Sequence, residues 1–232
     1  YQENYLTRGQ LKLGHDVYVI TSKYEYSMKF NKTNRINKCG EYDYHGVKII
    51  RFPDYIELKE NALVIMKNMI PKFKDIKPDI IFFHDVSPSL LYGIVYKLFN
   101  PNVKLQVDFH SDFNNAYSSK IGPIYHFFYK LIFKLFINKF DKFFPVAPEC
   151  KVFIKKVYSL PESKIVHLPL PGDSSILEFY ESVRKNYRNK LKLTNDNIVI
   201  VHTGKLPEDK ETLLVLKSFK KIKNKNYRLI IA

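Results

Sequence analysis

Two short segments, 108–112 and 204–210, hold the residues whose types and spacing could do chemistry. The second reads Gly-Lys-Leu-Pro-Glu-Asp-Lys and lies between an apolar run typical of a strand and a helical pattern. Ligands of open α/β sheets bind beyond the carboxyl ends of strands. Gly204 would let the backbone approach a phosphate there, and Lys205 and Lys210 could flank a diphosphate. The alternative is an ordinary strand–loop–helix turn with solvated lysines.

The other segment, Asp-Phe-His-Ser-Asp, also ends a predicted strand. We expect His110 and Asp112, two residues apart, to face one crevice. An imidazole that titrates near neutrality could give a proton or a hydrogen bond to a substrate hydroxyl. His84 and Asp85 end the preceding strand, so a metal site is an alternative, although no residues have zinc-ligand spacing. A purely structural role for the histidines is the other alternative.

The elements that must position these residues alternate along the chain, which predicts an α/β fold with a parallel sheet and crossover helices. Pro71 predicts a kink or a break in the second helix. The expected strands are 17–21, 47–52, 80–84, 105–109, 143–147, 165–168, 198–203 and 228–232, and the expected helices are 5–13, 62–76, 88–99, 124–140, 149–158 and 213–222.

The punctuation Leu-Pro-Leu-Pro-Gly-Asp at 168–173 is typical of a linker. A new strand, glycine turn and helix after residue 197 predict the start of a second α/β domain. We therefore expect one domain over 1–170, and a linker with the beginning of another over 171–232. The chain opens without methionine and ends inside an apolar run, so we expect truncation at both ends.

Composition narrows the function classes. The net charge is +15, yet only six of the 38 basic residues are arginine, the type preferred for bidentate phosphate recognition. The lysines are scattered, so we expect no nucleic-acid partner, whereas a nucleotide or an acidic membrane suits a positive field. Two distant cysteines predict a reduced, cytoplasmic protein, and no apolar run reaches the roughly 18 residues of a membrane span.

One predicted helix, within 125–142, carries a polar stripe. Lys130, Lys134, Asn138 and Lys142 recur every four residues on an otherwise apolar cylinder. This pattern predicts either a surface that touches an anionic membrane or a mostly buried crossover helix with a solvated stripe.

Taken in order, these pieces resemble the GT-B retaining glycosyltransferases of family 4. The resemblance covers nearly the whole chain and includes an opening helix that begins Tyr-Gln-Glu-Asn, as in one branch of the family. The segments that carry it are 1–6, 13–21 (Leu-Gly-His-Asp-Val-Tyr-Val-Ile-Thr), 77–84 (Lys-Pro-Asp-Ile-Ile-Phe-Phe-His), 108–112, 143–149, 163–173 and 204–210.

The chain departs from the family pattern at several points. Lys205 stands where arginine is usual, which keeps the charge but loses the bidentate fork. Glu211 stands in place of a common glycine. Ala147 and Pro148 stand where serine is common. The first strand, its glycine-rich loop, the donor turn and the Glu-x₇-Glu motif are all missing, so we expect this chain alone to be inactive.

The resemblance implies transfer of a sugar from a nucleotide diphosphate sugar to a carbohydrate or lipid-linked acceptor in cell-envelope polysaccharide or glycolipid synthesis. It implies that Lys205 and Lys210 stabilise the departing diphosphate and that His110 contacts the donor sugar. No Asp-x-Asp occurs in the chain, so we expect no metal and no cofactor. The acceptor side would be lined by Tyr1, Gln2, Glu3, Asn4, His84 and Asp112.

Two other functions fit the same residues. A nucleotide-sugar epimerase, or a phosphorylase-like enzyme, would keep the fold and change the chemistry. Epimerisation needs no acceptor and releases no nucleotide diphosphate. A non-enzymatic basic module would instead bind anionic lipid or nucleic acid, with strong salt dependence.

Overall fold

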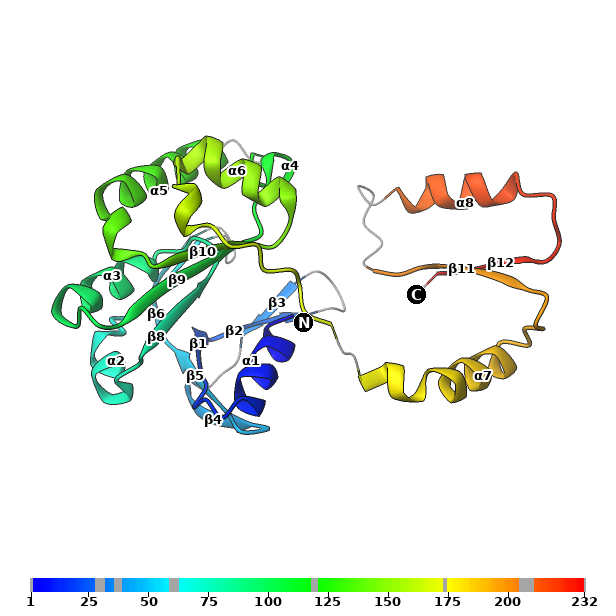
Figure 1. Cartoon of the computed structure of the whole chain (residues 1–232), viewed down its shortest axis with the longest axis horizontal. Coiled ribbons are helices and arrows are strands. Elements are labelled where there is room, and N and C mark those ends of the chain that lie inside the picture. The colour runs from blue at the N-terminus through cyan, green and yellow to red at the C-terminus, as the bar shows by residue number, and fades with distance from the viewer. Residues whose placement is uncertain are drawn as a thin grey trace. The chain divides into compact units, whose positions relative to one another are not determined.

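The computed structural model describes residues 2–27, 32–35, 39–58, 63–117, 121–172, 175–204 and 211–231. The chain divides into two compact units, Tyr1–Gly172 and Asp173–Ala232 (Figure 1). Each unit is an α/β assembly, which confirms the predicted fold class.

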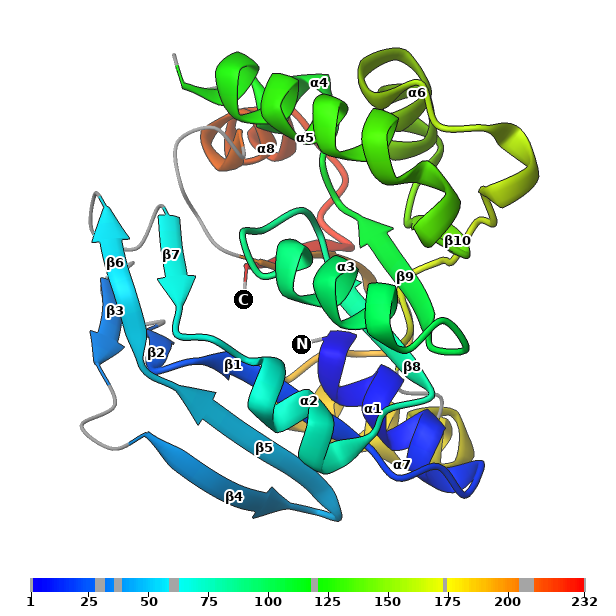
Figure 2. The ribbon, with the colours of Figure 1, turned by 90° about the vertical axis from the view of Figure 1, so that its left-hand side faces the viewer.

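A three-stranded parallel sheet carries the core of the first unit. Its strands are β8 (Ile80–His84), β9 (Lys104–Phe109) and β10 (Lys142–Pro145), with β9 in the centre. Between them run α3 (Leu90–Phe99), α5 (Gly122–Phe136) and the short 3-10 turn η1 (Ile137–Lys139). The next helix, α6 (Pro148–Tyr158), packs with α5, and both views show the two over one side of β9 and β10 (Figures 1 and 2).

Large apolar side chains fill the space between this sheet and its helices. Leu105, Val107 and Phe109 alternate along β9 and are wholly buried. Phe133 of α5 and Phe153 of α6 close over them. On the neighbouring helix α3, a Cβ added at Gly93 would lie 2.6 Å from the Phe83 ring. Only glycine therefore lets α3 approach β8 so closely.

A second three-stranded sheet has the order β1-β5-β4. In it β1 (Tyr18–Ser22) runs parallel to β5 (Val47–Phe52), and β4 (Gly40–Tyr44) pairs antiparallel with β5. His45 and Gly46 both have positive φ, of 53° and 85°, as a two-residue type I′ hairpin requires. The first helix, α1 (Gln2–Lys12), contacts β5.

The structure adds two features to the predicted parallel sheet and crossover helices. Among the described residues, no ladder joins the two three-stranded sheets, and β1 and β8 are edge strands. Two antiparallel hairpins were also missed, β2 (Tyr24–Ser27) with β3 (Lys32–Arg35), and β6 (Asp54–Leu58) with β7 (Leu63–Met66). The predicted strand at 165–168 is reduced to an isolated bridge between Ile165 and Phe143, which comes directly after the 3-10 turn η2 (Glu162–Lys164).

The predicted helix at 62–76 is half wrong. Its first part is strand β7, and only α2 (Ile70–Ile76) is helical. Pro71 lies in the first turn of α2, where its missing N–H costs nothing because the first N–H groups of a helix have no partner within it. The proline therefore marks where the helix begins rather than a kink within it.

The second unit contains the parallel pair β11 (Ile198–His202) and β12 (Tyr227–Ile231), connected through α8 (Thr212–Lys220). Before them lie the 3-10 segment η3 (Ser175–Phe179) and the polar helix α7 (Tyr180–Lys190). The β11–α8–β12 segment is the strand–helix–strand unit from which parallel sheets are built.

Candidate functional site

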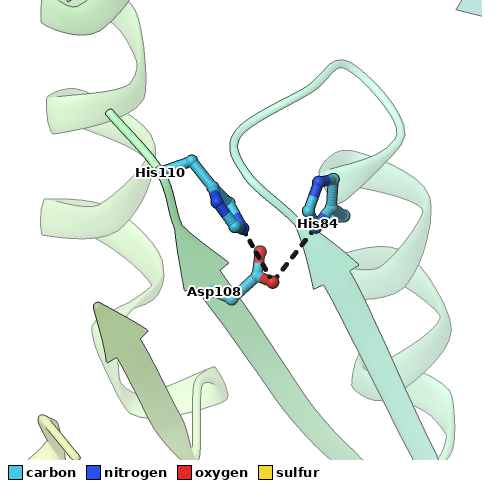
Figure 3. Close-up of side chains that lie close together, drawn as sticks. All are labelled: His84, Asp108 and His110. Carbon is cyan, nitrogen blue, oxygen red and sulfur yellow. Dashed lines mark hydrogen bonds and ion pairs between the residues drawn. The ribbon is translucent and has the colours of Figure 1, made fainter. Parts of the chain in front are cut away.

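The carboxyl ends of β8 and β9 bring three polar side chains together. The parallel register places His84, the last residue of β8, opposite Asp108 of β9. Alternation along the chain then directs His110, two residues after Asp108, to the same side. Figure 3 shows both imidazoles turned toward the Asp108 carboxylate.

One carboxylate oxygen holds both rings. Asp108 Oδ2 lies 3.1 Å from His84 Nδ1 and 3.1 Å from His110 Nε2. Because an ionised carboxylate only accepts, each of these nitrogens must carry a hydrogen. Neutral His110 then has its lone pair on Nδ1, and neutral His84 has its lone pair on Nε2. The ring centroids are 4.4 Å apart, so the two imidazoles form one compact group.

Asp108 is a buried charge with a full set of partners. Its side chain is 3% exposed, against 26% for His110 and 47% for His84. Burial alone would raise the pKa of Asp108, but the hydrogen bonds from His110 and His84, the charge of His84 and the Asp85 N–H lower it to about 2. The carboxylate is therefore ionised at any physiological pH.

The loop after β8 holds the His84–Asp108–His110 cluster in place through hydrogen bonds of Asp85. Asp85 has a φ of 58°, an uncommon conformation for a residue with a side chain, and its N–H donates to Asp108 Oδ1 at 2.9 Å. The Asp85 carboxylate accepts hydrogen bonds from the Val86 N–H and from the Ser111 hydroxyl. Such strained backbone persists where the surroundings hold it, as they do here beside the histidines.

Asp112 has a structural task that the sequence analysis did not foresee. It is the N-cap of α4 (Phe113–Ala116), and its carboxylate accepts from the N–H groups of Asn114 and Asn115. Asn115 completes a capping box and donates to the His110 carbonyl at 3.0 Å. Asp112 thereby orients the segment that carries His110, and its role toward an acceptor stays a prediction.

The other acceptor-side residues predicted from the sequence lie on or before α1. Tyr1 lies outside the described residues, and for Gln2 and Glu3 only the helical backbone is described. Asn4 lines a small hollow between α1 and the β1–β5 sheet, together with Thr7, Arg8, Val19, Tyr44, Val47 and Ile49. None of the three residues of the histidine cluster lines this hollow.

The predicted phosphate loop is described only at its edges. Gly204 follows β11 with a φ of 129°, which only glycine adopts readily, and a Cβ there would meet nothing within 4 Å. Lys205 and Lys210 lie outside the described residues. His202 Nε2 lies 3.1 Å from the Thr212 hydroxyl, which ties the end of β11 to the start of α8 across the loop.

Asp108 is the residue that the sequence analysis missed. A carboxylate in the interior of an apolar strand is costly unless paired, and its spacing of two from His110 places both on one face of β9. That signal was present in the sequence. The pairing with His84 needed the register between β8 and β9, which the sequence alone does not show.

The same three side chains could hold a metal ion. One ligand atom each from His84, Asp108 and His110 lies within 4.8 Å of the others. Two imidazoles and a carboxylate suit transition metals rather than Mg²⁺ or Ca²⁺. The expectation of no metal therefore stays a prediction.

A Rossmann-like α/β domain with polar groups at the carboxyl ends of its parallel strands is the architecture of an enzyme that binds its ligand at the sheet edge. The model of Glycosyltransferase Family 4 matches residues 4–174, about three-quarters of the chain. The chain belongs to this family, so glycosyltransferase-type chemistry with a sugar donor and an acceptor follows for it. No curated protein matches the chain.

Proposed function

We propose that this protein is a retaining glycosyltransferase that moves a hexose from a nucleotide diphosphate sugar to an acceptor. The bond from the anomeric carbon to the diphosphate oxygen breaks, and the nucleoside diphosphate leaves with the electron pair. A bond to an acceptor oxygen forms on the same face of the sugar, and the acceptor hydroxyl gives its proton to the departing diphosphate. The single observation that carries the proposal is the His84–Asp108–His110 cluster at the sheet edge of a family 4 chain.

In this proposal His110 contacts the donor sugar. Asp108 fixes the tautomer and the orientation of the ring, so neutral His110 can accept a hydrogen bond from a sugar hydroxyl at Nδ1 but cannot donate one there. A protonated His110 would donate from Nδ1 instead. A buried, ionised Asp108 beside it supports either form without moving, which is the preorganisation that transfer requires.

The leaving diphosphate would be stabilised by Lys205 and Lys210, with Gly204 allowing close backbone approach. The position of these residues after β11, at the start of a strand–helix–strand unit, suits a phosphate. Basic side chains rather than a divalent metal would neutralise the developing charge, in keeping with the lack of Asp-x-Asp in the sequence.

The acceptor would be a carbohydrate or a lipid-linked sugar of the cell envelope. Tyr1, Gln2, Glu3, Asn4, His84 and Asp112 would line its side of the crevice. In the same proposal the protein is cytoplasmic and contacts the anionic inner face of a membrane peripherally. Among the helices that the structure describes, none is long and apolar enough to cross a membrane.

The test is a double substitution in the full-length protein. Lys205→Ala with Lys210→Ala should lower turnover at least about 100-fold, because each lost donor leaves transition-state charge without a partner. The matched control is Lys217→Ala with Lys220→Ala, which removes two exposed lysines from α8 and should leave turnover unchanged. Near-normal turnover in the first variant would exclude the assignment of the loop, and loss of activity in a metal chelator would exclude metal independence.

A further inference from the structure

One face of α5 exposes a row of large apolar side chains. We define the α5 stripe as the six residues Ile121, Ile124, Phe127, Phe128, Leu131 and Leu135, which are between 43% and 75% exposed. Their spacing of three and four places them along a single side of the helix. His126, Tyr129, Ile132 and Phe133 are buried on the opposite side. The stripe is therefore not the side that α5 packs into the core.

Such a stripe needs a partner. Single exposed apolar residues are ordinary on a protein surface, but a contiguous apolar stripe marks a site that binds another protein, a ligand or a membrane. The buried side of α5 contacts α6 and, through Phe133, the sheet residues Phe109 and Phe143. The exposure of the stripe shows that the described residues of the first unit do not cover it.

The charges around the stripe identify the partner. Residues 121–140 contain no aspartate or glutamate, whereas Lys130 and Lys134 are exposed beside the stripe. Lysine stems can cover apolar surface while their ammonium groups reach outward toward phosphates. A second copy of the chain would bring a second set of lysines and no acid from this helix to pair with them, which disfavours an isologous dimer here.

We propose that the α5 stripe lies in the headgroup region of a membrane that contains anionic phospholipid, with Lys130 and Lys134 contacting lipid phosphates. An amphipathic helix with aromatic and leucine side chains on one face and lysines at its border lies in the membrane plane in this way. At 15 residues α5 is too short to span. The inference rests on the proposed function, in which the acceptor belongs to the cell envelope, and it names the surface that brings the enzyme there.

The experiment measures co-sedimentation of the full chain with vesicles of phosphatidylglycerol and phosphatidylcholine, and with phosphatidylcholine alone. Phe127→Ser with Leu135→Ser should weaken binding to the anionic vesicles at least about tenfold, since two large side chains no longer leave water. Lys130→Gln with Lys134→Gln should weaken it by about tenfold or more and should reduce the salt dependence. All four side chains are exposed, and circular dichroism checks that the variants fold.

Matched controls come from the second unit. Leu213→Ser with Leu214→Ser removes two exposed apolar side chains from α8, and Lys185→Gln with Lys190→Gln removes two exposed charges from α7. Both should bind vesicles like the unaltered chain. Equal weakening by these controls, or equal binding by the α5 variants, overturns the proposal. So does self-association in the absence of lipid that the Phe127→Ser, Leu135→Ser change abolishes, because the stripe would then be an interface between copies.

Failure of this inference can be told apart from failure of the proposed function. Transfer to a water-soluble acceptor by the full-length protein should be unchanged in the α5 variants. Transfer without vesicle binding rejects the docking surface alone. Vesicle binding by a protein that never transfers sugar rejects the proposed function and keeps the surface.

Discussion

At the scale of single residues, Asp108 organises the candidate site. It is the only member of the His84–Asp108–His110 cluster that contacts both of the others through one oxygen, and it is the most buried of the three. The histidines were predicted from the sequence because their residue type and strand-end position are visible there. Their shared partner Asp108 was missed although its spacing of two from His110 was visible, and only its pairing with His84 depends on the register between β8 and β9.

The depressed pKa of Asp108 makes a prediction about stability. A carboxyl whose pKa falls from 3.8 to about 2 on folding stabilises the folded state above its ordinary pKa. That stabilisation, about 2 kcal/mol, is lost as the pH falls through the range between these two values. Asp108→Asn should therefore lower the free energy of unfolding by about this amount at neutral pH and by clearly less near the folded-state pKa.

Urea unfolding across pH measures the effect. Asp16→Asn, at an exposed aspartate of the same unit, serves as the comparison and should change little. If the deficit of Asp108→Asn were the same at pH values above and below this range, the hydrogen bonds to the two histidines would not depend on the charge of Asp108.

At the scale of elements, Glu211 adopts a backbone conformation that favours glycine. It precedes α8 with φ 56° and ψ 25°, a left-handed conformation. The family pattern that the chain resembles has glycine at this point, and glycine adopts that conformation readily because it has no Cβ. The chain therefore bears a local backbone strain next to the loop that holds Lys210.

Substitution at Glu211 should reveal this strain. Glu211→Gly should keep or raise the thermal stability of the second unit, whereas Glu211→Val should lower it by about 1–2 kcal/mol relative to glycine. Calorimetry of the two variants side by side measures the difference. Equal stability of the valine and glycine variants would mean that the residue does not adopt the left-handed conformation in solution.

The elements also show how far sequence patterns reach. The bounds of β5 and β8 were predicted to the residue, because both are rich in β-branched and aromatic residues and have turn residues on each side. The helix at 62–76 failed because the run Leu63–Met66 suits a strand as well as a helix, and pairing with β6 decides the outcome. The hairpin of β2 and β3 was missed for a related reason, since its two four-residue polar strands carry little hydrophobic periodicity.

At the scale of the whole molecule, the family match and the histidine cluster both belong to the first unit. The family match at 4–174 covers the first unit, which carries the histidine cluster and the α5 stripe. The second unit carries the loop proposed to hold the diphosphate, and its role rests on its strand–helix–strand topology and on the resemblance. The net charge of +15 favours the anionic ligands proposed for both units. These are lipid phosphates at the α5 stripe of the first unit and a diphosphate at the loop of the second.

The most direct test of the central claim compares two histidines in the full-length protein. His110→Ala should lower kcat/KM for sugar transfer by at least about 100-fold, since a positioned imidazole at the reacting sugar contributes that much. His15→Ala makes the same chemical change at an exposed site of the same unit and should leave kcat/KM unaltered. A folded His110→Ala variant that transfers sugar as fast as the His15→Ala control would contradict the account.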